Sequence, residues 1–206
     1  MLKVLGRLTS INVRKVLWAA DEIGLVYERE DWGLPLRDPK APQFLTLNPN
    51  ALVPVIIDDG FVLWESNAIL RYLAEKASSA LLPADLRERA IMEQWLGWQV
   101  AELSPSWSYA FLALGRPTPG YDDRQKIMAS IEKWSARMAI LEQRLATTGA
   151  YVGGMRFTLA DIAIGLSVHR WFRTPFDRPG LPEIARYYQM LRTRAAASGY
   201  LGDQTP

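Results

Sequence analysis

The segment at residues 53–66, VPVIIDDGFVLWES, predicts two short strands that meet at an Asp-Asp-Gly turn and lead directly into a helix. Pro54 stands at the start of the first strand, although proline has no N–H to donate to a neighbouring strand. The second strand runs into Glu65 and Ser66, so a charge arrives where the helix begins. This part of the chain therefore belongs to a sheet, with Val53 at the end or edge of a strand.

The residues around this hairpin alternate between strand-like and helix-like patterns. The predicted elements are strands at residues 2–6, 25–30 and in the hairpin, and helices at residues 13–23, 42–47 and 66–76. Gly24 supplies the stop of the first helix, and Pro42 is tolerated in the first turn of the second. The order β-α-β-α-β-β-α predicts an α/β domain over residues 1–77.

Beyond residue 77 the strand-like alternation disappears and long helical patterns replace it. The stretch ASSALLPADLRERA is the predicted linker, and helical regions are predicted at residues 85–114, around 127–145, from 157, and at 181–197. In the second of these regions, large apolar residues recur at spacings of three and four and mark a core-facing stripe: Ile127, Ile131, Trp134, Met138, Leu141 and Leu145. An all-helical domain is therefore predicted at residues 86–206.

The composition narrows the class of function. The 206 residues include no cysteine, which excludes disulfides, thiolate metal sites and a cysteine nucleophile. A formal charge of +2 without dense basic patches favours small-molecule partners over nucleic acid or a membrane surface. Because the first residues lack the apolar run of a signal peptide and no segment approaches about 18 apolar residues, we expect a cytoplasmic location. No clustered ligand pattern indicates a metal, and His169 is expected to be structural.

Two features of the opening segment suit a peptide-like ligand. A cis bond between Val53 and Pro54 would turn the backbone of Val53 away from its own sheet, free to pair with an extended peptide. The alternative is a proline that merely ends an edge strand. Glu65 and Ser66, at a helix start, suit the ammonium and carboxylate of an amino acid. The alternative for Ser66 is plain helix capping.

Three polar side chains, Thr9, Ser10 and Asn12, lie where the first helix begins. Ser10 or Asn12 serves either as the N-cap of this helix or as a hydrogen-bond donor to a bound anion. If the anion is a ligand thiolate with an ordinary pKa near 8.5, lowering the pKa by about 2 units takes roughly 2.7 kcal/mol of selective stabilisation. One charge-assisted hydrogen bond and a helix dipole supply about that much.

In four places the chain resembles the glutathione S-transferase family. NPNALVPVIIDDG is similar to the family's Asn-Pro-x-x-x-Val-Pro segment, and WESNAILRYL to its Glu-Ser-x-Ala-Ile helix start. LLPADLRERA resembles the family linker, and FTLADIAIG resembles a capping motif with Thr158 as N-cap and Asp161 three residues later. The resemblance covers nearly the whole chain. It implies a thioredoxin-like domain with a mixed four-stranded sheet, an all-α domain, and a cytosolic homodimer.

The resemblance also implies roles for single residues. Val53, before Pro54, would pair with the cysteinyl backbone of glutathione, and Glu65 with Ser66 would bind its γ-glutamyl end. Ser10 falls where serine-type members, such as the theta class, keep the hydroxyl that activates the thiol. Asn12 matches instead the asparagine of some bacterial members that reduce disulfides with glutathione, and Thr9 is a third candidate.

The substrate positions outside these motifs are less constrained. Ala51 and Leu52 depart from the family pattern near the glycyl carboxylate, and Lys40 is the substitute that we expect there. An apolar electrophile would bind against the helix that carries Trp107, because aromatic residues suit flat ligands. The leading hypothesis is a glutathione transferase that acts through Ser10 with no resident cofactor. A glutathione-dependent disulfide reductase and a non-catalytic binding protein on the same fold are the alternatives.

Overall fold

The computed structural model describes residues 1–202, which divide into two compact units, Met1–Leu82 and the residues from Pro83 onward. The division lies between the predicted domains, residues 1–77 and 86–206, and their independence as folding domains stays a prediction.

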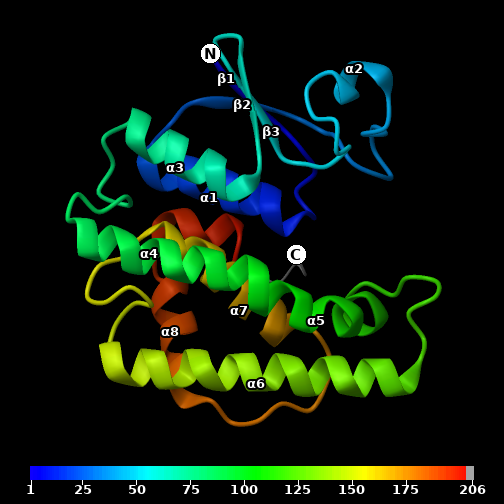
Figure 1. The fold of residues 1–206 in the computed structure, drawn as a ribbon, viewed down its shortest axis with the longest axis vertical. Helices are drawn as coiled ribbons and strands as arrows, with labels where there is room; N and C mark the ends of the chain where they lie inside the picture. Colours follow the sequence, from blue (N-terminus) through cyan, green and yellow to red (C-terminus); the bar gives the residue numbers. More distant parts are fainter. Residues whose placement is uncertain (203–206) are drawn as a thin grey trace. The chain divides into compact units, whose positions relative to one another are not determined.

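The first unit is an α/β structure built on one sheet (Figure 1). Its elements are β1 (Leu2–Leu5), α1 (Ile11–Ile23), β2 (Tyr27–Glu30), α2 (Pro42–Leu45), β3 (Val55–Asp58), β4 (Phe61–Trp64) and α3 (Ser66–Lys76). The strand order is β2-β1-β3-β4, with β1 parallel to β2 and antiparallel to β3, and β3 antiparallel to β4. The predicted order of elements and the mixed four-stranded sheet are confirmed.

The hairpin is closed by a two-residue turn. Asp59 and Gly60 both have positive φ, 49° and 90°, and pairs of positive φ are the geometry of the tight turn that matches the twist of a hairpin. Asp58 pairs with Phe61 across this turn. At the other end of β3 the peptide bond between Val53 and Pro54 is cis, as the first of the two interpretations of this proline requires, and the pairing of Val53 with a peptide stays a prediction.

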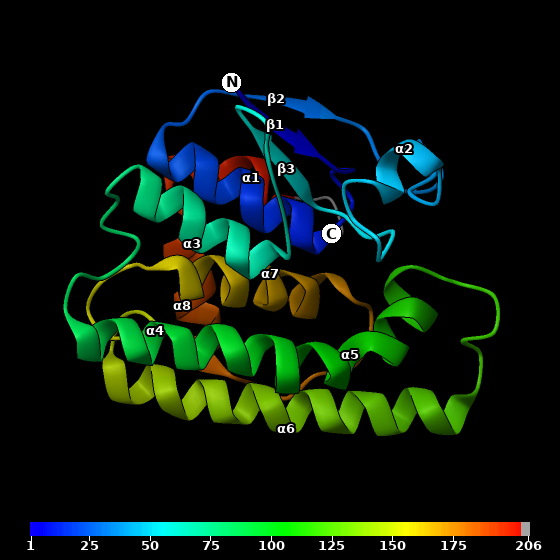
Figure 2. The same ribbon diagram turned by 45° about the horizontal axis from the view of Figure 1, so that its top comes forward.

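Helices α1 and α3 pack against each other and lie side by side on one face of the sheet (Figure 2). A buried carboxylate ties α3 to the strand in front of it. Asp58 accepts a hydrogen bond from Tyr72 Oη at 2.7 Å and forms an ion pair with Lys76. These bonds, first that of Lys76 and then that of Tyr72, hold the pKa of Asp58 below its usual value. Both bonds are made toward the C-terminal end of α3. They therefore fix the direction of this helix and the position of its N-terminus.

Close packing also fixes α1. Gly6, directly after β1, leaves no room for a side chain, because a Cβ there would stand 2.3 Å from Val13 Cγ2 and 3.2 Å from Val13 Cγ1. The N–H of Gly6 donates to the Glu30 carbonyl at 2.8 Å, and its own carbonyl accepts from Arg29. The backbone between β1 and α1 is thus held against both the helix and the neighbouring strand.

The second unit is helical. Its helices are α4 (Leu86–Trp98), α5 (Ser104–Ala110), α6 (Arg124–Thr148), α7 (Leu159–Arg173) and α8 (Pro182–Arg192), with a final 3₁₀ turn at Ala195–Gly199. Every residue of α7 from Leu159 to Trp171 is buried, and α7 packs against α4 and α8, which makes it the central helix of the unit. The predicted all-α character of this part of the chain is confirmed.

The structure differs in detail from two of the helix predictions. The region predicted at residues 85–114 is helical throughout but includes π-helical stretches, Gln99–Leu103 before Pro105 and Phe111–Gly115 at its end. Pro105 has no N–H for the carbonyl one turn earlier, which accounts for a change of hydrogen-bond pattern there.

The helix predicted at residues 181–197 was too long. Helix α8 ends at Arg192, and Arg194 has extended backbone angles, φ −73° and ψ 132°. Its guanidinium lies 3.6 Å from the ring centroid of Phe157, and this contact with a distant segment accompanies the break before the 3₁₀ turn.

The start of α7 has the capping box expected from its sequence. Asp161 accepts hydrogen bonds from the N–H of Thr158, the N–H of Val152 and Tyr187 Oη, at 2.9 to 3.0 Å. Because the carboxyl is completely buried, desolvation raises its pKa from 3.8 to about 6 in spite of these donors.

We predict that Gly6→Ala lowers the free energy of unfolding by about 1–3 kcal/mol, because the new methyl group overlaps Val13. Combined with Val13→Ala, the same change should cost clearly less, since the overlap is then removed. Urea unfolding of the two single variants and the double variant measures this coupling. Gly97→Ala is the control, since a Cβ at this exposed helical position meets no atom within 4 Å. Equal costs of Gly6→Ala in both backgrounds would contradict the overlap.

We predict that ionisation of Asp161 destabilises the folded chain between about pH 4 and pH 7. A raised pKa means that the folded state holds its proton more tightly, so this stabilisation is complete below pH 3.8 and is lost as the pH rises through about 6. A difference of about 2 pKa units corresponds to about 3 kcal/mol. Unfolding free energies of the wild type and Asp161→Asn across this range should diverge in slope, whereas Asp122→Asn, an exposed change, should follow the wild type.

Candidate functional site

The site begins at the N-terminus of α1. Ser10 holds the N-cap position with extended backbone angles, φ −92° and ψ 122°, and its carbonyl accepts from the N–H of Arg14 at 3.0 Å. Its side chain makes no capping hydrogen bond, and within residues 1–202 its half-buried hydroxyl has no hydrogen-bond partner. The interpretation of Ser10 as the N-cap of this helix is therefore confirmed in position, but its hydroxyl makes no capping bond and is available to a ligand.

The N-terminus of α3 is the second part. Glu65 stands at its N-cap position with φ 73° and ψ 109°, an unusual conformation for a residue with a side chain, and that side chain makes no capping bond. Ser66 is the first helical residue and is buried. Plain capping by Ser66 is thus wrong, because the N-cap of α3 is Glu65. A non-glycine residue held at positive φ, where the structure could have used glycine, points to a functional constraint on the Glu65 side chain.

A hydrogen bond joins these two helix starts. Ser66 Oγ donates to Asn12 Oδ1 at 3.3 Å, although the residues are 54 positions apart. One turn further along α1, Lys15 Nζ contacts Asn67 Oδ1 at 3.5 Å. The N-termini of α1 and α3 therefore meet at one place, where the positive ends of both dipoles favour an anion. Lys15 was missed in the sequence because a lysine within an apolar helix pattern gives no signal of its partner.

The contrast with the helices of the second unit strengthens this interpretation. Asp85 caps α4, Asp123 caps α6, and Thr158 with Asp161 caps α7, each through side-chain hydrogen bonds to first-turn N–H groups. The N-cap side chains of α1 and α3 make no such bond. The N-cap of α8 also makes no such bond, but its first-turn N–H groups donate to Glu142, whereas both N-cap side chains at this site are left free for another role.

Val53 offers backbone groups nearby. It precedes the cis bond to buried Pro54 and lies outside β3, and neither its N–H nor its carbonyl bonds another of the described residues. The loop before it is held by Asn48, whose Nδ2 donates to the carbonyl of Leu52 at 2.8 Å. The Val53 backbone is therefore fixed and unpaired, as strand addition by an extended ligand requires.

The remaining predicted residues lie in different surroundings. Thr9 is exposed in the turn before Ser10, and Lys40 is exposed on the loop before α2, where its N–H donates to Asp38. Trp107 belongs to the helical unit and is buried there beside Phe111 and Trp134. The guanidinium of Arg170 lies 4.3 Å from its ring centroid. Trp107 is thus part of that unit's aromatic core, and its contact with a substrate stays a prediction.

Among residues 1–202, no group of three or more His, Asp or Glu side chains is placed to hold a metal ion. No helix in the same range is long and apolar enough to cross a bilayer.

The arrangement suits a zwitterionic peptide-like ligand that carries an extra anionic group. The Ser10 hydroxyl and the N-termini of two helices, of which α3 begins at Ser66, can stabilise negative charge, while the exposed carboxylate of Glu65 can receive an ammonium. The backbone of Val53 can pair with the peptide between them. All these groups come from the first unit.

Comparison with known proteins gives a consistent answer. The model of the glutathione S-transferase N-terminal domain matches residues 1–75. Glutathione S-transferase GstB of Escherichia coli is 35% identical over 199 residues, which cover 95% of each chain. Disulfide-bond oxidoreductase YfcG of Escherichia coli is 33% identical over 180 residues, 79% of this chain and 80% of that protein.

A solved structure extends this likeness to the whole fold. The theta class glutathione S-transferase from Xanthomonas axonopodis pv. citri with glutathione bound superposes with a TM-score of 0.94 at 34% identity, over 100% of this chain and 99% of the other. With this fold, this arrangement of helix starts and relatives at this identity along 95% of its length, the chain belongs to the glutathione S-transferase family.

Proposed function

We propose that this enzyme binds glutathione on its first unit, stabilises the bound thiol as a thiolate with Ser10, and transfers it to an apolar electrophile. The observation that carries the proposal is the Ser10 hydroxyl, which stands at the N-terminus of α1 without a capping bond or any other partner among residues 1–202. A glutathione-bound theta class relative of nearly the same fold supports the choice of ligand.

The proposed binding mode uses the groups that the structure leaves available. Glu65 receives the ammonium of the γ-glutamyl end, and the N-terminus of α3, which begins at Ser66, receives its carboxylate through backbone N–H groups. The Val53 backbone, which the cis bond to Pro54 holds in place, pairs with the cysteinyl residue. Lys40 is the proposed contact of the glycyl carboxylate. Asn12 keeps Ser66 in position through the 3.3 Å hydrogen bond.

The chemistry follows from charge stabilisation. An uncommitted hydroxyl and the positive end of α1 favour the thiolate over the thiol, so the proton leaves to solvent near neutral pH. The two contributions, a charge-assisted hydrogen bond and a helix dipole, together supply roughly the 2.7 kcal/mol that a shift of about 2 pKa units needs. The sulfur then bonds to the electrophilic carbon, and with an aryl halide the halide ion departs with its electron pair.

The wider setting is also proposed. Trp107 is the candidate contact of a flat, apolar second substrate, and detoxification of such compounds would be the physiological purpose. The family resemblance favours a homodimer in the cytoplasm. Glutathione acts as a co-substrate, and the proposed mechanism uses no metal.

A second candidate is reduction of disulfides, in which two glutathione molecules reduce one disulfide to two thiols and leave oxidised glutathione. The likeness to a disulfide-bond oxidoreductase at 33% identity favours it. So does the exposed position of Asn12, whose amide N–H groups remain available while its Oδ1 accepts from Ser66. In this case Asn12 or Thr9 would hold the sulfur.

Ser10→Ala should lower kcat/KM for a nitro-activated aryl chloride by about tenfold to a hundredfold, because the bound thiolate loses its hydrogen-bond donor. The glutathione KM should change less than threefold, and the pH profile of kcat/KM should shift to higher pH. Steady-state kinetics between pH 6 and 9 measures both effects. Ser198→Ala, at an exposed serine of the second unit, is the control. An unchanged profile in Ser10→Ala would remove Ser10 from the mechanism.

Asn12→Ala distinguishes the two chemistries. If the enzyme is mainly a transferase, this variant should lose at most about tenfold in kcat/KM toward the aryl chloride, chiefly through a higher glutathione KM, because Ser66 loses its partner. If disulfide reduction is the main activity, turnover of a small symmetric disulfide should exceed aryl chloride turnover in the wild type and collapse in Asn12→Ala. Thr9→Val, assayed with the same two substrates, tests the third candidate.

A further inference from the structure

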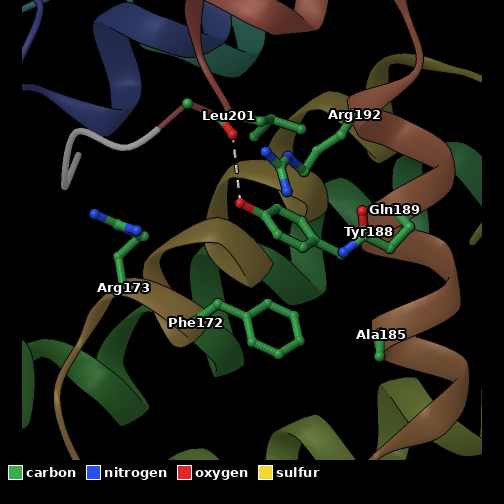
Figure 3. Close-up of a pocket in the computed structure, with 8 residues that line it drawn as sticks. Phe172, Arg173, Ala185, Tyr188, Gln189, Arg192 and Leu201 are labelled. Carbon is green, nitrogen blue, oxygen red and sulfur yellow. Dashed lines mark hydrogen bonds between the residues drawn. The ribbon is translucent and has the colours of Figure 1, made fainter.

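A pocket in the second unit shares no lining residue with the candidate site. It has a volume of about 210 Å³ and is formed by the end of α7, by α8 and by the segment after the 3₁₀ turn (Figure 3). The residues that line it are Phe172, Arg173, Ala185, Tyr188, Gln189, Arg192, Leu201 and Gly202. All of them belong to the unit that begins at Pro83.

Aromatic rings form one side of this pocket. Phe172 and Tyr188 are stacked, with ring centroids 4.9 Å apart and planes 29° apart. Tyr188 is held from behind, because its hydroxyl lies 2.7 Å from Nδ1 of buried His169, and it also reaches the carbonyl of Leu201 at 3.5 Å. The dashed line in Figure 3 marks this second bond. The half-buried ring of Phe172 and the fixed, largely buried ring of Tyr188 therefore give the pocket an aromatic wall.

Positive charge forms the rim. Arg173 and Arg192 both line the pocket, and among its described lining residues there is no acidic side chain. The guanidinium of Arg192 stands 5.8 Å from the Tyr188 ring centroid and, within residues 1–202, forms no ion pair. Each arginine lies in the last turn of its helix, where a cation is favourable in any case. That preference explains a positive charge at each helix end but not an aromatic pocket between the two charges.

We propose that this pocket is a second ligand site of the protein and that it binds a small aromatic carboxylate. The ring lies against Phe172 and Tyr188, and the carboxylate accepts hydrogen bonds from Arg192, with Arg173 adding to the positive potential. The exposed amide of Gln189 is a further donor at the rim.

The size of the pocket sets the size of the ligand. Sites that enclose drug-sized molecules have volumes of about 300–1,000 Å³, and this pocket is smaller. The pocket therefore has room for a molecule of the size of benzoate but not for a fused ring system. Few contacts are available to so small a ligand, so the expected dissociation constant is roughly millimolar.

Titration of the full-length protein with benzoate, followed by calorimetry, tests the proposal. Benzoate should bind with one site per chain. Benzamide, which keeps the ring without the charge, and acetate, which keeps the charge without the ring, should each bind at least about tenfold more weakly. Inorganic phosphate that binds as tightly as benzoate would show a site for charge alone and would overturn the aromatic part of the proposal.

Variants then locate the site. Arg192→Gln should weaken benzoate binding about tenfold or more, and Phe172→Leu should weaken it severalfold. Arg186→Gln is the matched control, because Arg186 lies on the same helix, pairs with Glu183 and does not line the pocket. Thermal unfolding of each variant separates loss of binding from loss of folding, and Arg192→Gln, at an exposed position, should fold normally.

Glutathione provides the last arm of the test. Benzoate should bind with the same dissociation constant in the presence of saturating glutathione, because no residue is shared between the pocket and the candidate glutathione site. Absence of benzoate binding, unchanged binding in Arg192→Gln, or displacement of benzoate by glutathione would each overturn the proposal. None of these outcomes depends on whether Ser10 activates a thiol.

Discussion

The hydrogen bond from Ser66 to Asn12 joins the starts of two helices that are 54 residues apart in the chain, and the arrangement of the candidate site depends on it. This hydrogen bond can form only because both helices are packed on the sheet in fixed positions. Gly6 lets α1 approach β1 at a distance that any side chain would prevent, and Asp58 holds α3 through Tyr72 and Lys76. A glycine after β1 and the bonds of buried Asp58 to α3 thus fix the positions of two helix N-termini. The positive ends of both dipoles are brought to one place without a metal or a cluster of lysines.

Much of this could be predicted from local sequence. The hairpin of residues 53–66 was predictable because Asp59 and Gly60 tolerate positive φ, and the helix at residues 66–76 was predicted with its observed bounds. The cis bond before Pro54 was one of two alternatives, and only the structure decided between them. Conformations that depend on one or two adjacent residues are therefore well encoded in short motifs.

What could not be predicted involves partners that are distant in the chain. Nothing near Asn12 indicates that its side chain meets Ser66, and nothing near Lys15 indicates Asn67. The end of α8 was misjudged for the same reason, because the alanine-rich residues after Arg194 favour a helix while the Arg194 side chain packs on Phe157 instead. Trp107 was predicted to contact a substrate only because aromatic residues suit flat ligands. Its burial against Phe111 and Trp134 depends on contacts between parts of the chain that no sequence motif connects.

The free N-cap side chains carry an energetic argument. A missing N-cap hydrogen bond costs about 1 kcal/mol, and a non-glycine residue at positive φ costs about 1–3 kcal/mol. Two such helices and Glu65 together give up roughly 3–5 kcal/mol, a large part of the 5–15 kcal/mol by which domains are stable. The same chain caps α4, α6 and α7 with Asp85, Asp123 and Thr158, and Glu142 accepts from two first-turn N–H groups of α8, so these helices do not share the deficit. A ligand at 100 times its dissociation constant returns about 2.7 kcal/mol, which offsets much of this deficit. The instability at the starts of α1 and α3 is therefore what a binding site on these helices requires.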